Sequence, residues 1–219
     1  MEQCMVEPCV FREMVDDRIS LMLSVHVDDM VVAGEEVDCN RLFDKISQKI
    51  PMTNLGELAL YTGCSFDRDW SKDTLTMDQT VFVDYLMERF EITSVSELPA
   101  TSLADLDPRR DDEEGGDWPF RPAVGCLLWL AMITRPDIAN AVRDVARHSH
   151  NPCARHWAGV LKILSYPNKN RSLGLTFTRG SRLELDVYAD AGVAEKSLDR
   201  RSVSGVAVML GGVAVSFSS

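Results

Sequence analysis

The N-terminal part of the chain combines hairpin patterns with amphipathic helical patterns. Two apolar runs, 19–27 and 30–34, surround the acidic pair Asp28-Asp29, and this pattern predicts a β-hairpin with both acids at its tip. Residues 38–50 carry apolar side chains at helical spacing and stop before a proline, which predicts a helix. The chain therefore opens with a hairpin followed by a helix.

A second hairpin and a second helix are expected next. Residues 58–66 and 74–77 surround a charged turn, and Asp78 is placed to cap a helix over 79–91. The apolar face expected for that helix consists of Phe82, Tyr85, Leu86 and Phe90. Residues 93–118 then lose all periodicity and contain prolines, glycines and an acidic run, which indicates an exposed connector.

The C-terminal part predicts helices first and strands afterwards. Three helices are expected, namely 121–133, one beginning near Pro136-Asp137, and one through Trp157 and Leu164 that stops at Pro167. Three strands are expected at 183–188, 203–210 and 212–217, with Gly211-Gly212 as a hairpin turn. These elements together predict an α+β fold, and the exposed edge near 213–217 favours aggregation of an unfinished sheet.

Composition narrows the class of protein. The chain has 219 residues with 45% apolar residues, which fits a globular protein rather than a disordered one. Its longest uncharged apolar run, 122–134, is too short to span a membrane. The N-terminus lacks a basic and apolar leader, and the six cysteines are scattered without a Cys-x-x-Cys pair. We therefore expect an intracellular protein, cytoplasmic or nuclear, that is neither secreted nor attached to a membrane.

Charge is unevenly distributed. The net charge is −11, yet residues 119–183 contain ten basic and two acidic residues. Such a stretch could follow a phosphate backbone, or it could be the solvated surface of ordinary helices. Charge alone leaves both interpretations open.

Two groups of residues could carry chemistry. Adjacent carboxylates at Asp28 and Asp29 repel each other unless a cation lies beside them, and oxygen ligands on a turn suit Mg²⁺ with a phosphate-bearing substrate. The alternative is an ordinary solvated acidic turn. The second group consists of His148, His150, Cys153 and His156. It could bind zinc, but Asn151-Pro152 interrupts the segment, so we expect an ordinary helix–loop–helix connection and no zinc.

A series of motifs resembles the reverse transcriptases of copia-type retrotransposon Pol polyproteins. The segment 26–34, HVDDMVVAG, resembles the family's Tyr-Val-Asp-Asp box. Further matching segments follow in the family's order: NLGEL (54–58) with YTG (61–63), MDQ (77–79) through Phe90, RPAVGCLLWLA (121–131) with TRPDIA (134–139), HW (156–157) with LSY (164–166), and YADA (188–191) with DRRSVSG (199–205). Six motifs in order cover nearly the whole chain.

This resemblance implies a division into parts. Residues 1–92 would be a partial polymerase palm with the Asp-Asp hairpin and a primer-grip hairpin, and 93–118 an acidic linker. Residues 119–182 would form a helical thumb and connection, and 183–219 the truncated start of a ribonuclease H domain. The partners would be an RNA or DNA primer–template and dNTPs in the intact polyprotein, while protein partners stay unknown.

The resemblance also assigns residues. Asp28 and Asp29 would be two of three palm carboxylates that hold Mg²⁺, or Mn²⁺, for nucleotidyl transfer, and Asp190 would be the first metal-binding and catalytic Asp of ribonuclease H. The residues expected to contact nucleic acid are Tyr61, Gly63, Arg143, Arg147 and Lys162.

Several departures from the family pattern limit the expected activity. The third palm carboxylate belongs to an earlier strand that the 27 residues before Asp28 do not supply, and His26 replaces the tyrosine of the box. Gly192 and Val193 replace an Asp and a Trp, and the remaining ribonuclease H acids would lie beyond Ser219. We therefore expect the isolated chain to be inactive as a polymerase. The alternative function is a non-catalytic module that binds nucleic acid or protein.

Overall fold

The computed structural model describes residues 1–97, 106–192 and 203–218. The chain has a mixed α+β fold with antiparallel sheets, as the sequence predicts. It divides into two compact units, residues 1–62 and 63–219, and each is described by itself. The domain boundaries expected at 92, 118 and 182 stay predictions.

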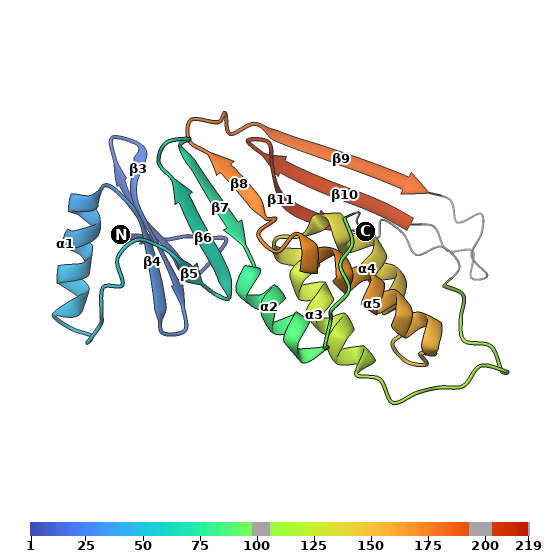
Figure 1. Cartoon of the computed structure of the whole chain (residues 1–219). Helices are drawn as coiled ribbons and strands as arrows, with labels where there is room; N and C mark the ends of the chain where they lie inside the picture. Colours follow the sequence, from blue (N-terminus) through green and yellow to red (C-terminus); the bar gives the residue numbers. More distant parts are fainter. Residues whose placement is uncertain (98–105, 193–202, 219) are drawn as a thin grey trace. The chain divides into compact units, whose positions relative to one another are not determined.

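The first unit is an antiparallel sheet with one helix. Its strands pair in the order β1-β2-β3-β4. The elements are β1 (Glu2–Gln3), β2 (Val10–Val15), β3 (Arg18–His26), β4 (Asp29–Gly34), α1 (Glu36–Ser47) and the short β5 (Leu60–Tyr61). Leu21 and Leu23 on β3 are its buried side chains, and β3 with β4 forms the expected hairpin (Figure 1). Burial of alternate β3 residues thus fixes one face of the hairpin as the inner face.

The second unit contains a hairpin, a helical group and a C-terminal sheet. Its elements are β6 (Cys64–Asp69), β7 (Thr74–Asp78), α2 (Thr80–Arg89), α3 (Phe120–Ile133), the 3₁₀ helix η1 (Pro136–Ile138), α4 (Ala139–Ala146), α5 (Ala154–Lys169), β8 (Leu175–Thr178), β9 (Leu185–Gly192), β10 (Val203–Leu210) and β11 (Val213–Ser218). Strand β7 pairs with both β6 and β8, and β10 pairs with both β9 and β11. Both predicted hairpins of this unit are therefore present.

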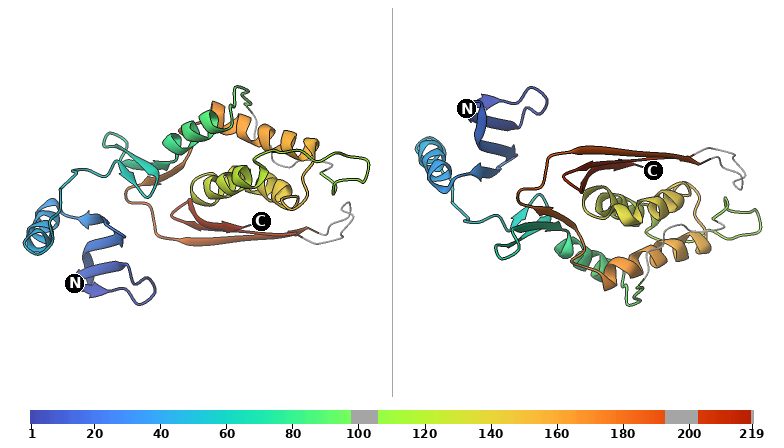
Figure 2. Two further views of the ribbon diagram at one scale, coloured as in Figure 1. Left: turned by 90° about the horizontal axis from the view of Figure 1, so that it is seen from below. Right: turned by 90° about the horizontal axis from the view of Figure 1, so that it is seen from above.

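The helices α2 to α5 lie together in the ribbon (Figure 2), and their buried side chains form one hydrophobic core. Side chains that are fully buried there include Leu86, Leu127, Leu130, Val142 and Leu164. The core is the main source of stability in this unit, because each such side chain contributes about 1.5–3 kcal/mol relative to exposure.

The face predicted for the second helix is partly wrong. Its buried residues are Val83, Leu86 and Met87, whereas Tyr85 is 45% exposed. Leu86 and Phe90 of the predicted face are buried in the core, and Phe82 is partly buried against it. Only Tyr85 is wrongly predicted, because the stripe that faces α3 and α5 also includes Val83 and Met87.

Several helix ends differ from the predictions, and the helix expected over 38–50 already ends at Ser47 as α1. The last helix was expected to stop at Pro167, but α5 continues to Lys169 with Pro167 inside it. A proline in the last turn removes only one intrahelical hydrogen bond, and the backbone N–H of Asn170 still donates to the Tyr166 carbonyl at 3.1 Å. Asp78 lies one residue before the N-cap of α2, and its carboxylate accepts the Thr80 backbone N–H at 2.8 Å.

Short or exposed strands were the elements that periodicity missed. Strand β2 carries charged residues between its apolar ones, and β8 has only four residues. The predicted Gly211-Gly212 turn is present, and both residues have positive φ, +59° and +82°. Glycine adopts this conformation without steric cost, so the dipeptide reverses the chain between β10 and β11.

Candidate active site and nucleic-acid interface

The acidic hairpin tip lies one residue earlier than the sequence predicts. The turn consists of Val27 and Asp28, while Asp29 begins β4 opposite His26. The pairing of Val25 with Met30 fixes this register, so only two residues remain for the loop. The two acids therefore differ in setting, since Asp28 lies in the turn and Asp29 on a paired strand.

The turn is strained at Val27. Its φ is +56°, in the left-handed region that β-branched residues avoid. A residue held there costs about 1–3 kcal/mol, and such positions cluster at functional sites. The strain fixes the direction in which the chain presents Asp28.

Replacing Val27 with glycine is expected to stabilise the first unit by about 1 kcal/mol, because glycine removes the steric conflict but adds chain entropy when unfolded. Urea unfolding followed by circular dichroism measures the change. The matched control is Val31→Gly on β4, which is expected to destabilise. A loss of stability in Val27→Gly comparable to that of the control would contradict the strain argument.

One face of the hairpin gathers polar side chains from three strands. His26 and Asp29 are direct cross-strand partners, and Ser24 lies two residues before His26 on the same face. The Tyr61 and Ser24 hydroxyl oxygens are 3.3 Å apart, and the Tyr61 ring meets the His26 ring edge-on with 6.4 Å between centroids. Tyr61, predicted as a nucleic-acid contact, therefore belongs to the same surface as the acidic turn.

The two carboxylates fit a divalent metal as a partial donor set. Asp28 and Asp29 are both exposed, and exposed carboxylate oxygens on a turn are the ligands that Mg²⁺ accepts together with water and substrate phosphates. In the described ranges, no group of three or more His, Cys, Asp or Glu side chains is arranged to hold a metal. A metal bound at this turn would need further ligands from outside this pair of carboxylates.

Asp190 belongs to the second unit, whereas Asp28 and Asp29 belong to the first. It lies in β9 opposite Gly205 of β10, and every residue of β9 is exposed. Part of the neighbouring motif, 199–202, lies outside the described residues. In the described part of the chain, Asp190 is not part of any group of three or more His, Cys, Asp or Glu side chains that could hold a metal.

The remaining predicted nucleic-acid contacts lie in three different settings. Gly63 has φ +80° in the turn before β6 and leaves open space where a side chain would stand. Arg147 and Lys162 are exposed, at the end of α4 and on α5. Arg143 is mostly buried, and one guanidinium nitrogen donates to Asp144 at 2.8 Å, while Nε and another guanidinium nitrogen have no hydrogen-bond partner among the described residues.

Acidic side chains, two of them from outside the basic stretch, pair with three of its arginines. Arg155 pairs with Glu113 at 2.6 Å and Arg171 pairs with Asp84, while Arg135 pairs with the nearby Asp137. The Arg155 side chain holds the pKa of Glu113 down to about 2, so that carboxylate stays charged. The surface of this unit is therefore less positive than its local sequence.

The histidine cluster is a packed connection. The His148 and His156 rings stack in parallel at 4.1 Å, and both are buried. His156 Nε2 lies 2.9 Å from the Asp107 carbonyl, and its Nδ1 accepts the Cys153 backbone N–H at 3.1 Å. Both ring nitrogens of His156 thus have backbone hydrogen-bond partners. The contact with Asp107 links the segment 93–118 to α5.

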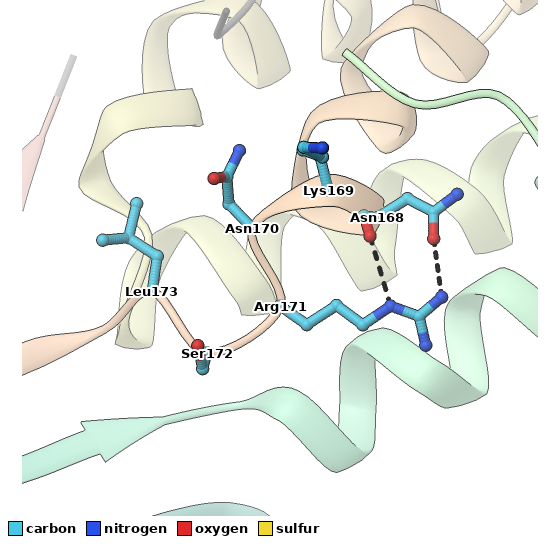
Figure 3. Close-up of a pocket in the computed structure, with 6 residues that line it drawn as sticks. All are labelled: Asn168, Lys169, Asn170, Arg171, Ser172 and Leu173. Atoms are coloured by element: carbon cyan, nitrogen blue, oxygen red, sulfur yellow. Dashed lines mark hydrogen bonds between the residues drawn. The ribbon is translucent and has the colours of Figure 1, made fainter. Parts of the chain in front are cut away.

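A hollow of about 480 Å³ follows the end of α5 (Figure 3). The residues 168–173 line it, and its Arg171 guanidinium is held by the carbonyl and the side chain of Asn168 and by Asp84. Because this cation is already engaged within the chain, the hollow adds no group to the sites described above.

Sequence analysis missed an exposed apolar stripe on α3. Leu128, Trp129 and Met132 are 39%, 43% and 67% exposed, although the opposite face of α3 is core. The sequence contains a signal for this stripe, because the helix is apolar on all sides. A helix that is buried on one side only needs apolar residues on that side alone. Exposed apolar patches of this kind mark interaction surfaces.

Comparisons with known proteins agree with the motif order. The chain is 30% identical over 97% of its length to the retrovirus-related Pol polyprotein from transposon TNT 1-94 of Nicotiana tabacum. It is 38% identical over 46% of its length to the secreted RxLR effector protein 161 of Plasmopara viticola, of which it covers 71%. It is also 26% identical over 91% of its length to the putative transposon Ty5-1 protein YCL074W of Saccharomyces cerevisiae, covering 65% of that protein.

The chain spans 17% of the tobacco polyprotein's length. No family model and no solved structure matches it. Within the described ranges, no helix is long and apolar enough to cross a membrane. The similarity to transposon polyproteins over nearly the whole chain, together with the ordered motifs, shows that this chain belongs to the Pol polyproteins of copia-type retrotransposons.

Proposed function

We propose that this chain is part of an RNA-directed DNA polymerase that acts on a primer–template. In this proposal it carries the end of the palm, the thumb and connection, and the beginning of a ribonuclease H domain. The observation that carries the proposal is the tip of the β3–β4 hairpin, where a strained turn presents Asp28 and pairing presents Asp29 beside it. The family of the chain supplies the context for that geometry.

The hairpin would supply metal ligands in fixed positions. Asp28 and Asp29 would hold the divalent ion, which when bound activates a primer 3′-hydroxyl and stabilises the leaving pyrophosphate. The cross-strand pairing of Asp29 and the strained φ of Val27 restrict where these carboxylates point, so little reorganisation is needed when substrate arrives. Tyr61, which contacts Ser24 and His26, would border the primer strand on the same face.

The helical part would hold the duplex. Lys162 on α5 and Arg147 at the end of α4 are exposed cations that suit phosphate contacts without sequence preference. The exposed stripe of α3 with Trp129 offers an apolar contact area in the same unit. Arg143 has a different role in this proposal, because its side chain is mostly buried and paired with Asp144.

A purified 219-residue chain is expected not to extend a primer. It contains the two hairpin carboxylates, whereas the family resemblance implies a third palm carboxylate for holding both metal ions. The test is incubation with a labelled primer on an RNA template, dNTPs and Mg²⁺ or Mn²⁺. Robust metal-dependent extension that disappears in Asp28→Asn would overturn this part of the proposal.

The second candidate function, a non-catalytic binding module, is favoured by the exposed cations and the α3 stripe. Because many arginines are already ion-paired, we expect salt to weaken duplex binding with a logarithmic slope of only about −3, or roughly 60-fold between about 50 and about 200 mM salt. Fluorescence anisotropy with a labelled RNA–DNA duplex measures this slope.

Lys162→Ala is expected to reduce that slope by about 1 and to weaken binding similarly for all sequences. Arg171→Ala serves as the control, because Asp84 already neutralises that guanidinium. Binding that is absent at low salt, or indifferent to salt, would contradict a phosphate-contacting role for this unit.

A further inference from the structure

We propose that His26 and Asp29 together form a binding site for a divalent transition ion that accepts an imidazole nitrogen. This ion would compete with Mg²⁺ at the carboxylate turn. The inference rests on the proposed function, since it assigns a further ligand and a metal preference to the same turn.

The pairing register places the two side chains together. His26 is the last residue of β3 and Asp29 the first of β4, and they are direct partners across the two-residue turn. Opposed residues of an antiparallel pair have their Cβ atoms about 4.5–5.5 Å apart on one face of the sheet. One ion with ligand distances of about 2.0–2.2 Å can bridge an imidazole nitrogen and a carboxylate oxygen over that span.

The surroundings leave this pair accessible. His26 and Asp29 are both exposed, and the Tyr61 ring approaches His26 edge-on from β5. This nearly perpendicular ring contact restricts the tilt of the imidazole. The hydroxyl contact with Ser24 positions Tyr61. Tyr61 therefore lies next to the His26 imidazole on the Ser24 side, not on the side of the turn.

The donor set determines which ion is favoured. Carboxylate and water ligands suit Mg²⁺, whereas imidazole suits Zn²⁺, Ni²⁺ and related ions. Adding His26 to Asp29 therefore raises the affinity for transition ions and leaves the affinity for Mg²⁺ almost unchanged. A transition ion bound by His26 and Asp29 would leave Asp28 as the one hairpin carboxylate still available to Mg²⁺.

The test uses the full 219-residue chain and Co²⁺, a paramagnetic ion that accepts imidazole. In a ¹H–¹⁵N NMR titration, we expect Co²⁺ to broaden signals around residues 24–29 first. His26→Asn is expected to weaken Co²⁺ binding by roughly tenfold and to change Mg²⁺ binding by less than about twofold. His150→Asn is the matched control, because His150 is exposed and far from the turn in sequence.

The outcomes separate this inference from the proposed function. Unchanged Co²⁺ affinity in His26→Asn, or broadening centred outside the hairpin, overturns the inference, while Mg²⁺ binding that is lost in Asp29→Asn still supports the proposed function. Loss of both Co²⁺ and Mg²⁺ binding in Asp29→Asn, with only Co²⁺ binding sensitive to His26→Asn, supports both. Mg²⁺ binding that Asp28→Asn and Asp29→Asn leave intact counts against the proposed function itself.

Discussion

Replacing Arg135 with alanine is expected to destabilise the second unit by about 3–5 kcal/mol, the range for breaking a buried ion pair. The Arg135 side chain is 1% exposed and donates to both carboxylate oxygens of Asp137, at 3.0 and 2.9 Å. A third nitrogen donates to the Asn170 carbonyl at 3.0 Å, and the guanidinium lies 4.9 Å from the centre of the Tyr166 ring. The arginine thus fastens η1 to the end of α5.

Urea unfolding of the variants measures this effect. Arg135→Lys keeps the charge but loses the planar fork, so its stability should fall between wild type and Arg135→Ala. The control is Arg121→Ala, at an exposed arginine that donates to the Ser149 carbonyl, with an expected loss below about 1 kcal/mol. Equal losses in Arg135→Ala and Arg121→Ala would show that the buried network does not stabilise the fold.

Acidification from pH 7 to pH 5 is expected to remove about 2 kcal/mol of stability, mainly through His148. Burial, with the neighbouring His156, lowers the pKa of His148 to about 4 from an ordinary value of 6.5. Burial also lowers the pKa of His156. Because the folded protein favours neutral rings, the unfolded chain binds more protons below pH 6.5, so stability is present above that pH and is lost as pH falls toward 4.

Unfolding curves at several pH values test this linkage. His148→Phe keeps a ring to stack on His156 but cannot take up a proton, so more than half of the stability change between pH 7 and pH 5 should disappear. Glu113 affects stability in a different pH range. Its pKa is lowered in the folded protein, so its contribution to stability is lost only as the pH falls below 4.5. A wild-type protein equally stable at pH 5 and pH 7 would refute the argument, and His150→Asn should behave like wild type.

Elements with strong periodicity could be predicted from the sequence, because alternation or helical spacing of apolar residues is a local pattern. The β3–β4 hairpin, the first helix and β10 all lie where alternation or helical spacing places them. Strand β2 could not be found in this way, since its Arg12 and Glu13 interrupt the apolar pattern, and its pairing with β3 depends on the tertiary fold. The exact turn at Val27 was also out of reach, because register is fixed by pairing across the hairpin.

In the candidate site, too, some features follow from local sequence pattern and others depend on the tertiary fold. The motif order located Asp28 and Asp29, and alternation along β3 was enough to place Ser24 and His26 on one face. The contact of Tyr61 with both depends on how residues 48–61 return to the sheet, which no local pattern encodes. Likewise, the charge of 119–183 could be counted from the sequence, but its neutralisation by Asp84 and Glu113 appears only in three dimensions.

The most direct test of the central claim is primer extension by the tobacco transposon polyprotein with these 219 residues in place of its matching section. We expect Mg²⁺-dependent DNA synthesis on an RNA template, reduced by roughly 10³-fold or more in Asp28→Asn and in Asp29→Asn, because each variant loses a metal-holding carboxylate worth several kcal/mol. DNA synthesis that persists unchanged in both variants would contradict the assignment of this hairpin as the polymerase metal site.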